Sequence, residues 1–280
     1  MLNRVLSRTI GLLKSTHPIP SFSVAGFTLL LALGYSFEVG AFVIVSLSVL
    51  AQQFSVGLSN DWLDFERDTS VNRKDKATAR GEVSASLVRN AALVSAGLAL
   101  ILSSSLGWQS ALMMLFMLAV GWSYNLGLKS NALSVVPYAV GFGILPIFVT
   151  MSLNPAQLPL WWITASASLL GVSAHFANAL PDLFDDKATG VRALPHILGQ
   201  RVSALVIAVA AGLASLLVVT QSESLNPVFA STGFLITMGF VLTASALALR
   251  PRPPKVIFHL LIVATLVNVV LLMLSQLQAV

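Results

Sequence analysis

The chain of 280 residues contains no cysteine and has few charged side chains. Without cysteine it forms no disulfide framework, and it has no thiolate for nucleophilic chemistry or metal binding. Only 10% of its residues are charged, whereas an ordinary soluble domain carries about 25%. This scarcity of charge, with a mean hydropathy of +0.85, excludes a water-soluble globular enzyme, a disordered chain and a nucleic-acid-binding module.

Long apolar stretches take the place of the missing charges. A membrane-spanning helix needs about 20 mostly apolar residues, and nine such stretches follow one another with short connections between them. The sequence therefore predicts an all-α, polytopic membrane protein with about nine transmembrane helices and a single domain over residues 1–280. The stretches are 19–37, 39–59, 84–104, 107–127, 132–152, 157–180, 201–220, 228–249 and 256–277.

The positions of the basic residues predict the orientation in the membrane. All 16 Lys and Arg residues lie in the N-terminal segment or on one side of the nine-helix arrangement, and the opposite connections carry only Glu38 and Glu223. Because an excess of Lys and Arg marks cytoplasmic loops, we expect an integral plasma-membrane protein with its N terminus inside and its C terminus outside. The net charge of +5 then reflects topology and does not indicate a nucleic-acid partner.

The segment 1–16 precedes the first apolar stretch and has a different pattern. Leu6, Ile10 and Leu13 recur at helical spacing, with Arg8 and Lys14 away from them. This pattern predicts an amphipathic helix that lies on the cytoplasmic membrane surface and contacts lipid.

The rare acidic residues form two clusters with the same spacing. Ten of the 11 precede residue 187, and both clusters contain Asn-x3-Asp-x3-Asp. Each member of the second cluster follows its counterpart by 118 residues, which indicates an internal duplication of a four-helix unit. The members are Asn60, Asp64 and Asp68 in the first cluster and Asn178, Asp182 and Asp186 in the second.

This spacing has a chemical consequence. Residues i, i+4 and i+8 project from one face of a helix, and carboxylates at membrane depth are costly unless they are paired or hydrated. Mg²⁺ is commonly held by one or two carboxylates together with substrate phosphate oxygens. Two acidic stripes facing one cavity therefore predict Mg²⁺ and a diphosphate substrate. Acidic residues at helix ends are often only solvated, but the repeated spacing favours a site.

Basic residues on the same side fit this hypothesis. Arg73 and Lys76 lie between the second and third apolar stretches, and Lys129 follows the fourth, five residues after Tyr124. Cations in these places can pair with the negative charge that develops on a leaving diphosphate.

The sequence Asn60-Asp61-x-x-Asp64-x-x-x-Asp68 resembles the first signature, NDxxDxxxD, of the UbiA family of intramembrane prenyltransferases. Asp182 and Asp186 match the second family signature, DxxxD on the sixth helix. Tyr124 with Lys129 also resembles a family segment after the fourth helix. The chain departs from the family at His17-Pro18, where a basic residue often precedes the proline.

The resemblance implies a nine-helix, UbiA-like bundle in which a lipid-open chamber is capped by cytoplasmic loops. It implies Mg²⁺-dependent transfer of an isoprenyl group from a prenyl diphosphate to a lipophilic or aromatic acceptor, with no obligate protein partner. It assigns metal binding to Asp61, Asp64, Asp68, Asp182 and Asp186, of which the last four are also catalytic, together with Lys129 and Tyr124. It assigns substrate binding to Asn60, Asp61, Arg73, Lys76 and Asn178.

Several interpretations stay open at this point. His175 lies one turn before Asn178, so it could contact the acceptor or act as a base, or it could only be hydrogen-bonded between helices. Some relatives in the family transfer to carotenoids or porphyrin esters, or move a phosphoribosyl group. A cation-coupled transporter would also have repeated halves and buried carboxylates, although transporter sites tend to lie at the midplane. A catalytically inactive scaffold is the remaining alternative.

Overall fold

A computed structural model describes residues 2–74, 76–183 and 192–279. The described residues form helices and connecting loops. In chain order the helices are α1 (Leu2–Ser15), α2 (Pro18–Gly34), α3 (Val39–Leu63), α4 (Phe65–Ser70), α5 (Ala85–Ser104), α6 (Trp108–Asn125), the 3₁₀ turn η1 (Leu128–Ser130), α7 (Val136–Met151), α8 (Trp161–Ala179), the 3₁₀ turn η2 (Leu180–Asp182), α10 (Leu194–Gln221), α11 (Pro227–Ala248) and α12 (Val256–Ala279).

The all-helical membrane fold is confirmed, but the count of nine spans is not. Each of the nine predicted stretches contains a long helix, yet by length and composition six described helices could cross a membrane, or up to seven if α1 and α2, bent by 58°, form one span. Helix α2 has only 17 residues, and α8 carries buried polar side chains such as Ser166, Ser173 and His175. Polar residues that face the protein interior lower the mean hydropathy without preventing membrane insertion.

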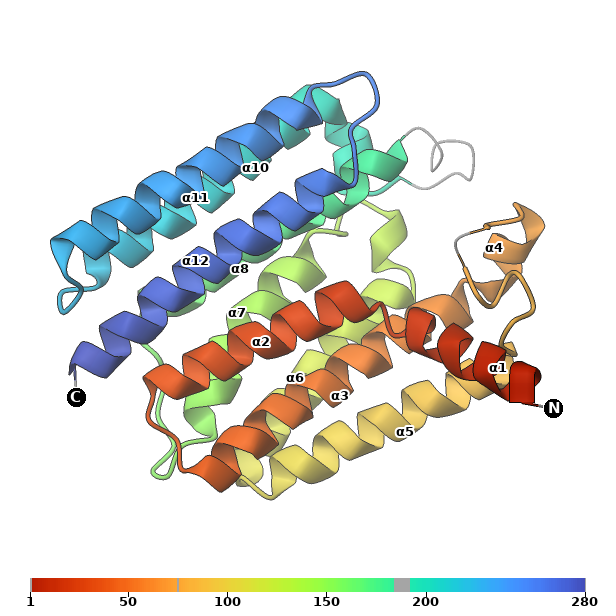
Figure 1. Ribbon diagram of the computed structural model, residues 1–280, viewed down its shortest axis with the longest axis horizontal. Coiled ribbons are helices and arrows are strands. Elements are labelled where there is room, and N and C mark those ends of the chain that lie inside the picture. The colour runs from red at the N-terminus through yellow and green to blue at the C-terminus, as the bar shows by residue number, and fades with distance from the viewer. Residues whose placement is uncertain (1, 75, 184–191, 280) are drawn as a thin grey trace.

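The long helices surround a central space. Helices α2, α3, α6, α7, α8 and α12 pack against one another in sequence around it, with α5 outside α3 and α6, and with α10 and α11 outside α8 and α12. Helices α1 and α4 lie at the end of the bundle that carries the N terminus, and the C terminus lies at the other end (Figure 1). The packing order α2–α3–α5–α6 is repeated by α7–α8–α10–α11, which supports the predicted duplication.

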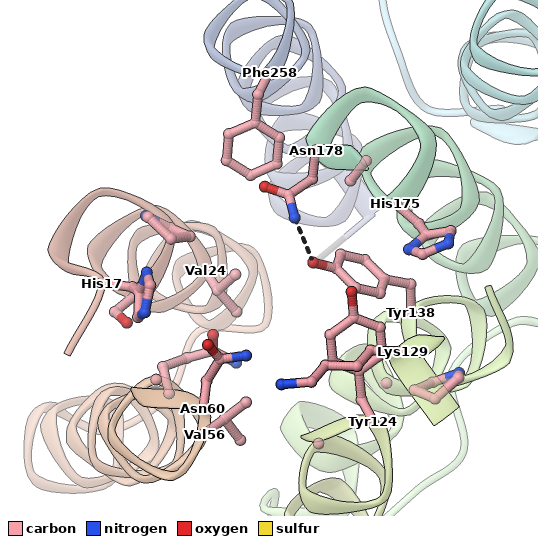
Figure 2. A pocket seen from close by; sticks show the side chains of 18 of the residues that line it. His17, Val24, Val56, Asn60, Tyr124, Lys129, Tyr138, His175, Asn178 and Phe258 are labelled. Carbon is pink, nitrogen blue, oxygen red and sulfur yellow. Dashed lines mark hydrogen bonds between the residues drawn. The ribbon is translucent and has the colours of Figure 1, made fainter. Parts of the chain in front are cut away.

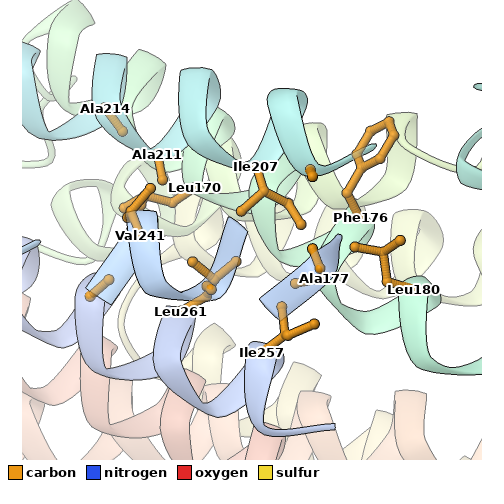
Figure 3. Close-up of a cluster of buried hydrophobic side chains, with 14 of the residues drawn as sticks. Leu170, Phe176, Ala177, Leu180, Ile207, Ala211, Ala214, Val241, Ile257 and Leu261 are labelled. Atoms are coloured by element: carbon orange, nitrogen blue, oxygen red, sulfur yellow. The ribbon is translucent and has the colours of Figure 1, made fainter. Parts of the chain in front are cut away.

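Two apolar cores flank the central space. One is built from α2, α3, α5, α6 and α7, around Val45, Met114 and Phe148. The other joins α8, α10, α11 and α12, where Ala177, Ala211 and other small residues let the backbones approach closely (Figure 3). Small residues at helix contacts are the usual means of close packing in membranes, because lipid supplies no hydrophobic drive between helices.

Two glycines bring backbones together near the central space. A Cβ on Gly57 of α3 would collide with the Thr16 carbonyl in the α1–α2 junction. A Cβ on Gly171 of α8 would collide with the Tyr138 carbonyl of α7 and with the Phe142 side chain. The glycines therefore set the distances between the helices that carry the polar residues described below.

Candidate active site

A cavity of ≈ 650 Å³ opens between α2, α3, α6, α7, α8 and α12. Figure 2 shows its two main walls, one carrying His17, Val24 and Asn60, and the other carrying Tyr124, Lys129, Tyr138, His175 and Asn178, with Phe258 at the edge between them. Its deeper lining is mostly apolar and includes Phe27, Met117, Phe142, Leu145 and Ile262, with Gln52 and Gln53 as polar exceptions. The cavity thus joins a polar end to an apolar interior.

The first acidic cluster lies at the polar end, but not on one unbroken helix. Helix α3 ends at Leu63, Asp64 is the junction, and Asp68 belongs to α4. The expected single stripe is therefore divided, although the Asp64 N–H donates to the Asn60 carbonyl at 3.0 Å and the Asp68 N–H to the Asp64 carbonyl at 2.8 Å. These i to i+4 bonds keep Asn60, Asp64 and Asp68 on the same side, and all three line the cavity.

Asp64 is held by two cations. The Lys129 ammonium lies 2.6 Å from both carboxylate oxygens, and the Arg67 guanidinium lies 2.9 Å from Oδ2. Burial lowers the pKa of Lys129, and the Asp64 carboxylate opposes that shift. All three side chains line the cavity, so the arrangement is a compact set of alternating charges at its polar end.

Asp68 has an unsatisfied oxygen. Its side chain is only 1% exposed, Oδ1 lies 3.5 Å from the Arg67 guanidinium, and Oδ2 has no hydrogen-bond partner within the described residues. Burial raises the pKa of Asp68, and the neighbouring Asp64 carboxylate adds to this, while Lys76, Arg67 and Arg73 act in the opposite direction. Asp68 lines the cavity, and a carboxylate is a suitable ligand for a hard cation.

Asp61 has a different environment from the one expected. Its Oδ1 accepts from the Lys76 ammonium at 2.5 Å and lies 2.9 Å from His17 Nε2. Lys76 and His17 line the cavity, whereas Asp61 is absent from the described lining. Its expected role as a metal ligand stays a prediction, and its position favours holding Lys76 and His17 in place.

The other residues predicted for the site from the first half of the chain, Asn60, Arg73 and Tyr124, also line the cavity. Asn60 Nδ2 donates to Asn125 Oδ1 at 3.0 Å, and Asn125 Nδ2 donates to the Val56 carbonyl at 2.8 Å. Arg73 lines the polar end, and its backbone N–H donates to the Asp68 carbonyl at 2.9 Å. Tyr124 also lines the cavity, with its ring centroid 5.3 Å from that of Tyr138.

The second cluster is described only in part. Asn178 lines the cavity and its amide donates to the Tyr138 hydroxyl at 3.4 Å. The backbone of Asp182 lies in η2, but its side chain and the whole of Asp186 lie outside what the structure describes. Within the described ranges no three acidic or histidine side chains gather as a metal site. Two carboxylates, those of Asp64 and Asp68, line the cavity. One or two carboxylates are the usual protein ligands of a Mg²⁺ ion that is also bound to substrate phosphates.

Sequence reasoning missed several cavity residues. Arg67 could have been found, since it lies three residues from Asp64 and so on the same helical face. Tyr138, which lines the cavity, belongs to no motif. The same holds for Ser134, which is not among the lining residues but contacts His175 at 3.0 Å. All four histidines of the chain line the cavity, from α8, α10, α12 and the residue that precedes α2: His17, His175, His196 and His259.

Comparison with known proteins places this geometry in a family. The model of the UbiA prenyltransferase family matches residues 20–275. A digeranylgeranylglyceryl phosphate synthase from Thermococcus sibiricus is 24% identical over 235 residues, which cover 80% of each chain.

Solved structures agree in fold. A UbiA homologue from Aeropyrum pernix K1 superposes with a TM-score of 0.74 at 16% identity, covering 89% of this chain and 94% of that one. A UbiA homologue from Archaeoglobus fulgidus, bound to DMAPP and Mg²⁺, superposes with a TM-score of 0.71 at 14% identity, covering 96% and 99%. Because the family match extends over nearly the whole chain, this integral membrane protein belongs to the UbiA prenyltransferase family.

Proposed function

We propose that the protein transfers an isoprenyl group from a prenyl diphosphate to a lipophilic acceptor in a Mg²⁺-dependent reaction. The observation that carries this proposal is the cavity itself, in which the carboxylates of Asp64 and Asp68 and the cations of Arg67 and Lys129 meet an apolar interior. A diphosphate suits the charged end, and an isoprenyl chain suits the rest.

The residues present fit a metal–diphosphate unit. The free Oδ2 of Asp68 and the cavity-facing carboxylate of Asp64 would hold Mg²⁺, and the homologue from Archaeoglobus fulgidus was solved with DMAPP and Mg²⁺. Mg²⁺ held there would supply positive charge that offsets the negative charge of the carboxylates and of a diphosphate. On the expectation from the family resemblance, Asp182 and Asp186 would complete the metal site from the second cluster.

The chain's own cations would act on the leaving group. When the allylic C–O bond breaks, its electron pair stays on the diphosphate, and Lys129, Arg67 and Arg73 lie at the polar end of the cavity to stabilise that charge. Lys76, fixed by Asp61 at 2.5 Å, would add a fourth cation. The allylic cation would then be captured by an electron-rich atom of the acceptor, which loses a proton.

The acceptor and the orientation are part of the proposal. A relative is named for the synthesis of digeranylgeranylglyceryl phosphate, which supports a lipid acceptor. The one-sided distribution of Lys and Arg supports a cytoplasmic active-site end and an external C terminus, in the plasma membrane.

A direct assay tests the proposal. The purified protein in detergent would receive labelled geranyl, farnesyl or geranylgeranyl diphosphate, Mg²⁺ and a membrane lipid extract. We expect a labelled lipid product that Asp64→Asn abolishes. Glu38→Gln, in the connection before α3 and remote from the cavity lining, is the matched control and should retain activity. Absence of Mg²⁺-dependent binding of every prenyl diphosphate would contradict the proposal and reopen the transporter and scaffold interpretations.

A further inference from the structure

Helix α1 carries an exposed apolar face. Leu6, Ile10 and Leu13 follow one another at helical spacing and share one side of the helix, and their side chains are 57%, 43% and 56% exposed. Helix α1 is bent by 58° from α2 and lies at the end of the bundle that carries the N terminus (Figure 1). Phe22 on α2 is also 57% exposed. In an integral membrane protein, an amphipathic helix with such a face lies in the lipid interface.

The charges of this segment specify the kind of lipid. Residues 1–16 contain three basic residues, Arg4, Arg8 and Lys14, and no acidic residue. An anionic membrane surface attracts basic residues that lie close to it, and this attraction adds to the burial of the apolar face. The surface that complements α1 is therefore anionic lipid.

The opposite face of α1 packs on the loop between α4 and α5. Gly11 is buried, and a Cβ at this position would lie 3.5, 3.5 and 3.6 Å from the Cβ atoms of Glu82, Val83 and Ala77. Leu12 packs against an apolar cluster that contains Ala77 and Val83, which are only 1% and 2% exposed. One side of α1 is thus attached to the loop, while the other side is open to lipid.

The same loop carries a cation of the candidate active site. Lys76 directly precedes Ala77 and lines the cavity, and its ammonium lies 2.5 Å from Asp61 Oδ1. The Glu82 N–H donates to the Ala77 carbonyl at 3.0 Å, which keeps the loop compact. None of the described residues of α1 lines the cavity. Helix α1 can therefore act on the site through Ala77, because a shift of this residue moves its neighbour Lys76.

We propose that α1 is a membrane-anchored brace for this loop. Leu6, Ile10 and Leu13 insert into an anionic lipid surface, and the opposite face of the helix holds Ala77 so that Lys76 stays at the cavity. Helix α1 is then a positioning element that contacts no substrate. This inference rests on the proposed function and adds to it a dependence of prenyl diphosphate binding on the surrounding lipid.

Substitutions on the exposed face test the lipid contact. The measurement is steady-state prenyl transfer in nanodiscs of phosphatidylcholine, with or without phosphatidylglycerol. We expect phosphatidylglycerol to lower the KM of the prenyl diphosphate about tenfold, the value of one charge-assisted hydrogen bond, with kcat unchanged. Anionic lipid alone would act in the opposite direction, because it repels a diphosphate.

The double variant Leu6→Ser/Ile10→Ser should have the higher KM in both lipids. The apolar exchange Leu6→Ile/Ile10→Leu is the matched control and should behave as wild type. A KM that responds neither to the lipid nor to the serine substitutions would overturn the proposal.

Arg8→Gln tests the electrostatic part of the contact and should weaken the effect of phosphatidylglycerol on KM. Arg252→Gln is the control, since Arg252 is an exposed basic residue in the connection between α11 and α12, and it should leave this effect unchanged. An equal loss in both variants would show a general influence of charge and would overturn the assignment to α1.

Substitutions of Gly11 test the contact with the loop. Gly11→Ala places its Cβ at ordinary contact distances and should keep the KM of wild type. The larger side chain of Gly11→Leu should push α1 away from Ala77 and raise the KM of the prenyl diphosphate about tenfold in both lipids. A wild-type KM for Gly11→Leu would overturn the coupling between α1 and Lys76.

Spin labels test both contacts without turnover. Because the chain has no cysteine, Ile10→Cys and Ala79→Cys each provide a single labelling site. In nanodiscs with phosphatidylglycerol, oxygen should reach the label at residue 10 while an aqueous nickel complex should not. A label open to water would overturn the lipid contact.

The label at residue 79 reports on the loop. Its mobility should increase when Leu6→Ser/Ile10→Ser is added, and unchanged mobility would overturn the bracing role. If the protein binds no prenyl diphosphate but both labels respond as expected, the proposed function fails and the lipid-anchored brace stands.

Discussion

Lys129 and Asp64 are 65 residues apart in the sequence, yet the Lys129 ammonium lies 2.6 Å from both carboxylate oxygens of Asp64. The pair joins η1 to the α3–α4 junction. It therefore couples the residue expected to bind metal with a residue expected to stabilise the leaving group. On the proposed function, Lys129 would be shared between Asp64 and the diphosphate when substrate binds.

This pair predicts unequal effects of its two single substitutions. Asp64→Asn leaves the buried Lys129 without its carboxylate and should lower the free energy of unfolding by about 3 kcal/mol. Lys129→Met should cost less, since Arg67 still pairs with Asp64 at 2.9 Å. The double variant should recover part of the loss. Denaturant unfolding in detergent measures the cycle, and strictly additive changes would show that the two side chains are not coupled.

We expect Asp61→Asn to have a kinetic effect that differs from that of Asp64→Asn. Asp61 holds Lys76 and His17 and is not among the described cavity-lining residues. Its loss should release two cavity side chains and raise the KM of the prenyl diphosphate about tenfold, a shift of about 1.4 kcal/mol. The Mg²⁺ concentration for half-maximal rate should change little. A strong change in that concentration would instead identify Asp61 as a metal ligand.

Asp68 predicts opposite pH effects on stability and on activity. Burial raises the pKa of the Asp68 carboxyl, so the folded state binds this proton more tightly than the unfolded state does. The protonated carboxyl therefore stabilises the fold at low pH, and this stabilisation is lost as the pH rises through the raised pKa. Metal-free Asp68→Asn should therefore be about 1 kcal/mol more stable than wild type at neutral pH, with a smaller difference in acid.

Activity should change with pH in the direction opposite to stability, because Mg²⁺ binding needs the deprotonated carboxylate of Asp68. Transfer by the wild type should fall on acidification at a higher pH than expected for an ordinary aspartate, and Asp68→Asn should be inactive. Unfolding and transfer measured over about pH 4 to 8 provide the check. A variant less stable than wild type at neutral pH would contradict the assigned burial cost.

We expect Gly171→Ala to cause a packing defect between α7 and α8, next to the cavity. The added Cβ meets the Tyr138 carbonyl and Phe142, and overpacking of this kind costs about 1–3 kcal/mol. Gly97→Ala on α5 is the control, since a Cβ there meets no atom within 4 Å. Thermal unfolding should separate the two variants, and equal stability would show that α7 and α8 can move apart freely.

Some of this architecture could be predicted from local signals. Long apolar stretches locate the helices, and the spacing of Asn60, Asp64 and Asp68 predicts that they share one side, because helical geometry alone determines that relation. The break at Asp64 could not be predicted, since it depends on how α4 and the following loop pack over the cavity. The count of nine spans stays a prediction, because buried polar residues in helices such as α8 lower the mean hydropathy by which a span is identified.

The partners of the site residues depend on tertiary packing. Nothing in the sequence pairs Lys76 with Asp61 rather than with Asp68, or brings Ser134 to His175. These contacts join loops to helices that are 15 and 41 residues away. Tyr138 could not be found from the sequence either, because it carries no charge and belongs to no motif.

The placement of every histidine on one cavity wall or another has a practical consequence. Selective ¹⁵N-histidine labelling would yield imidazole signals from the cavity alone, without background from the rest of a membrane-embedded chain. Signals from His17 would report on the diphosphate end and signals from His175 on the opposite wall. The order in which two substrates enter could then be followed in a single spectrum, without adding any artificial probe.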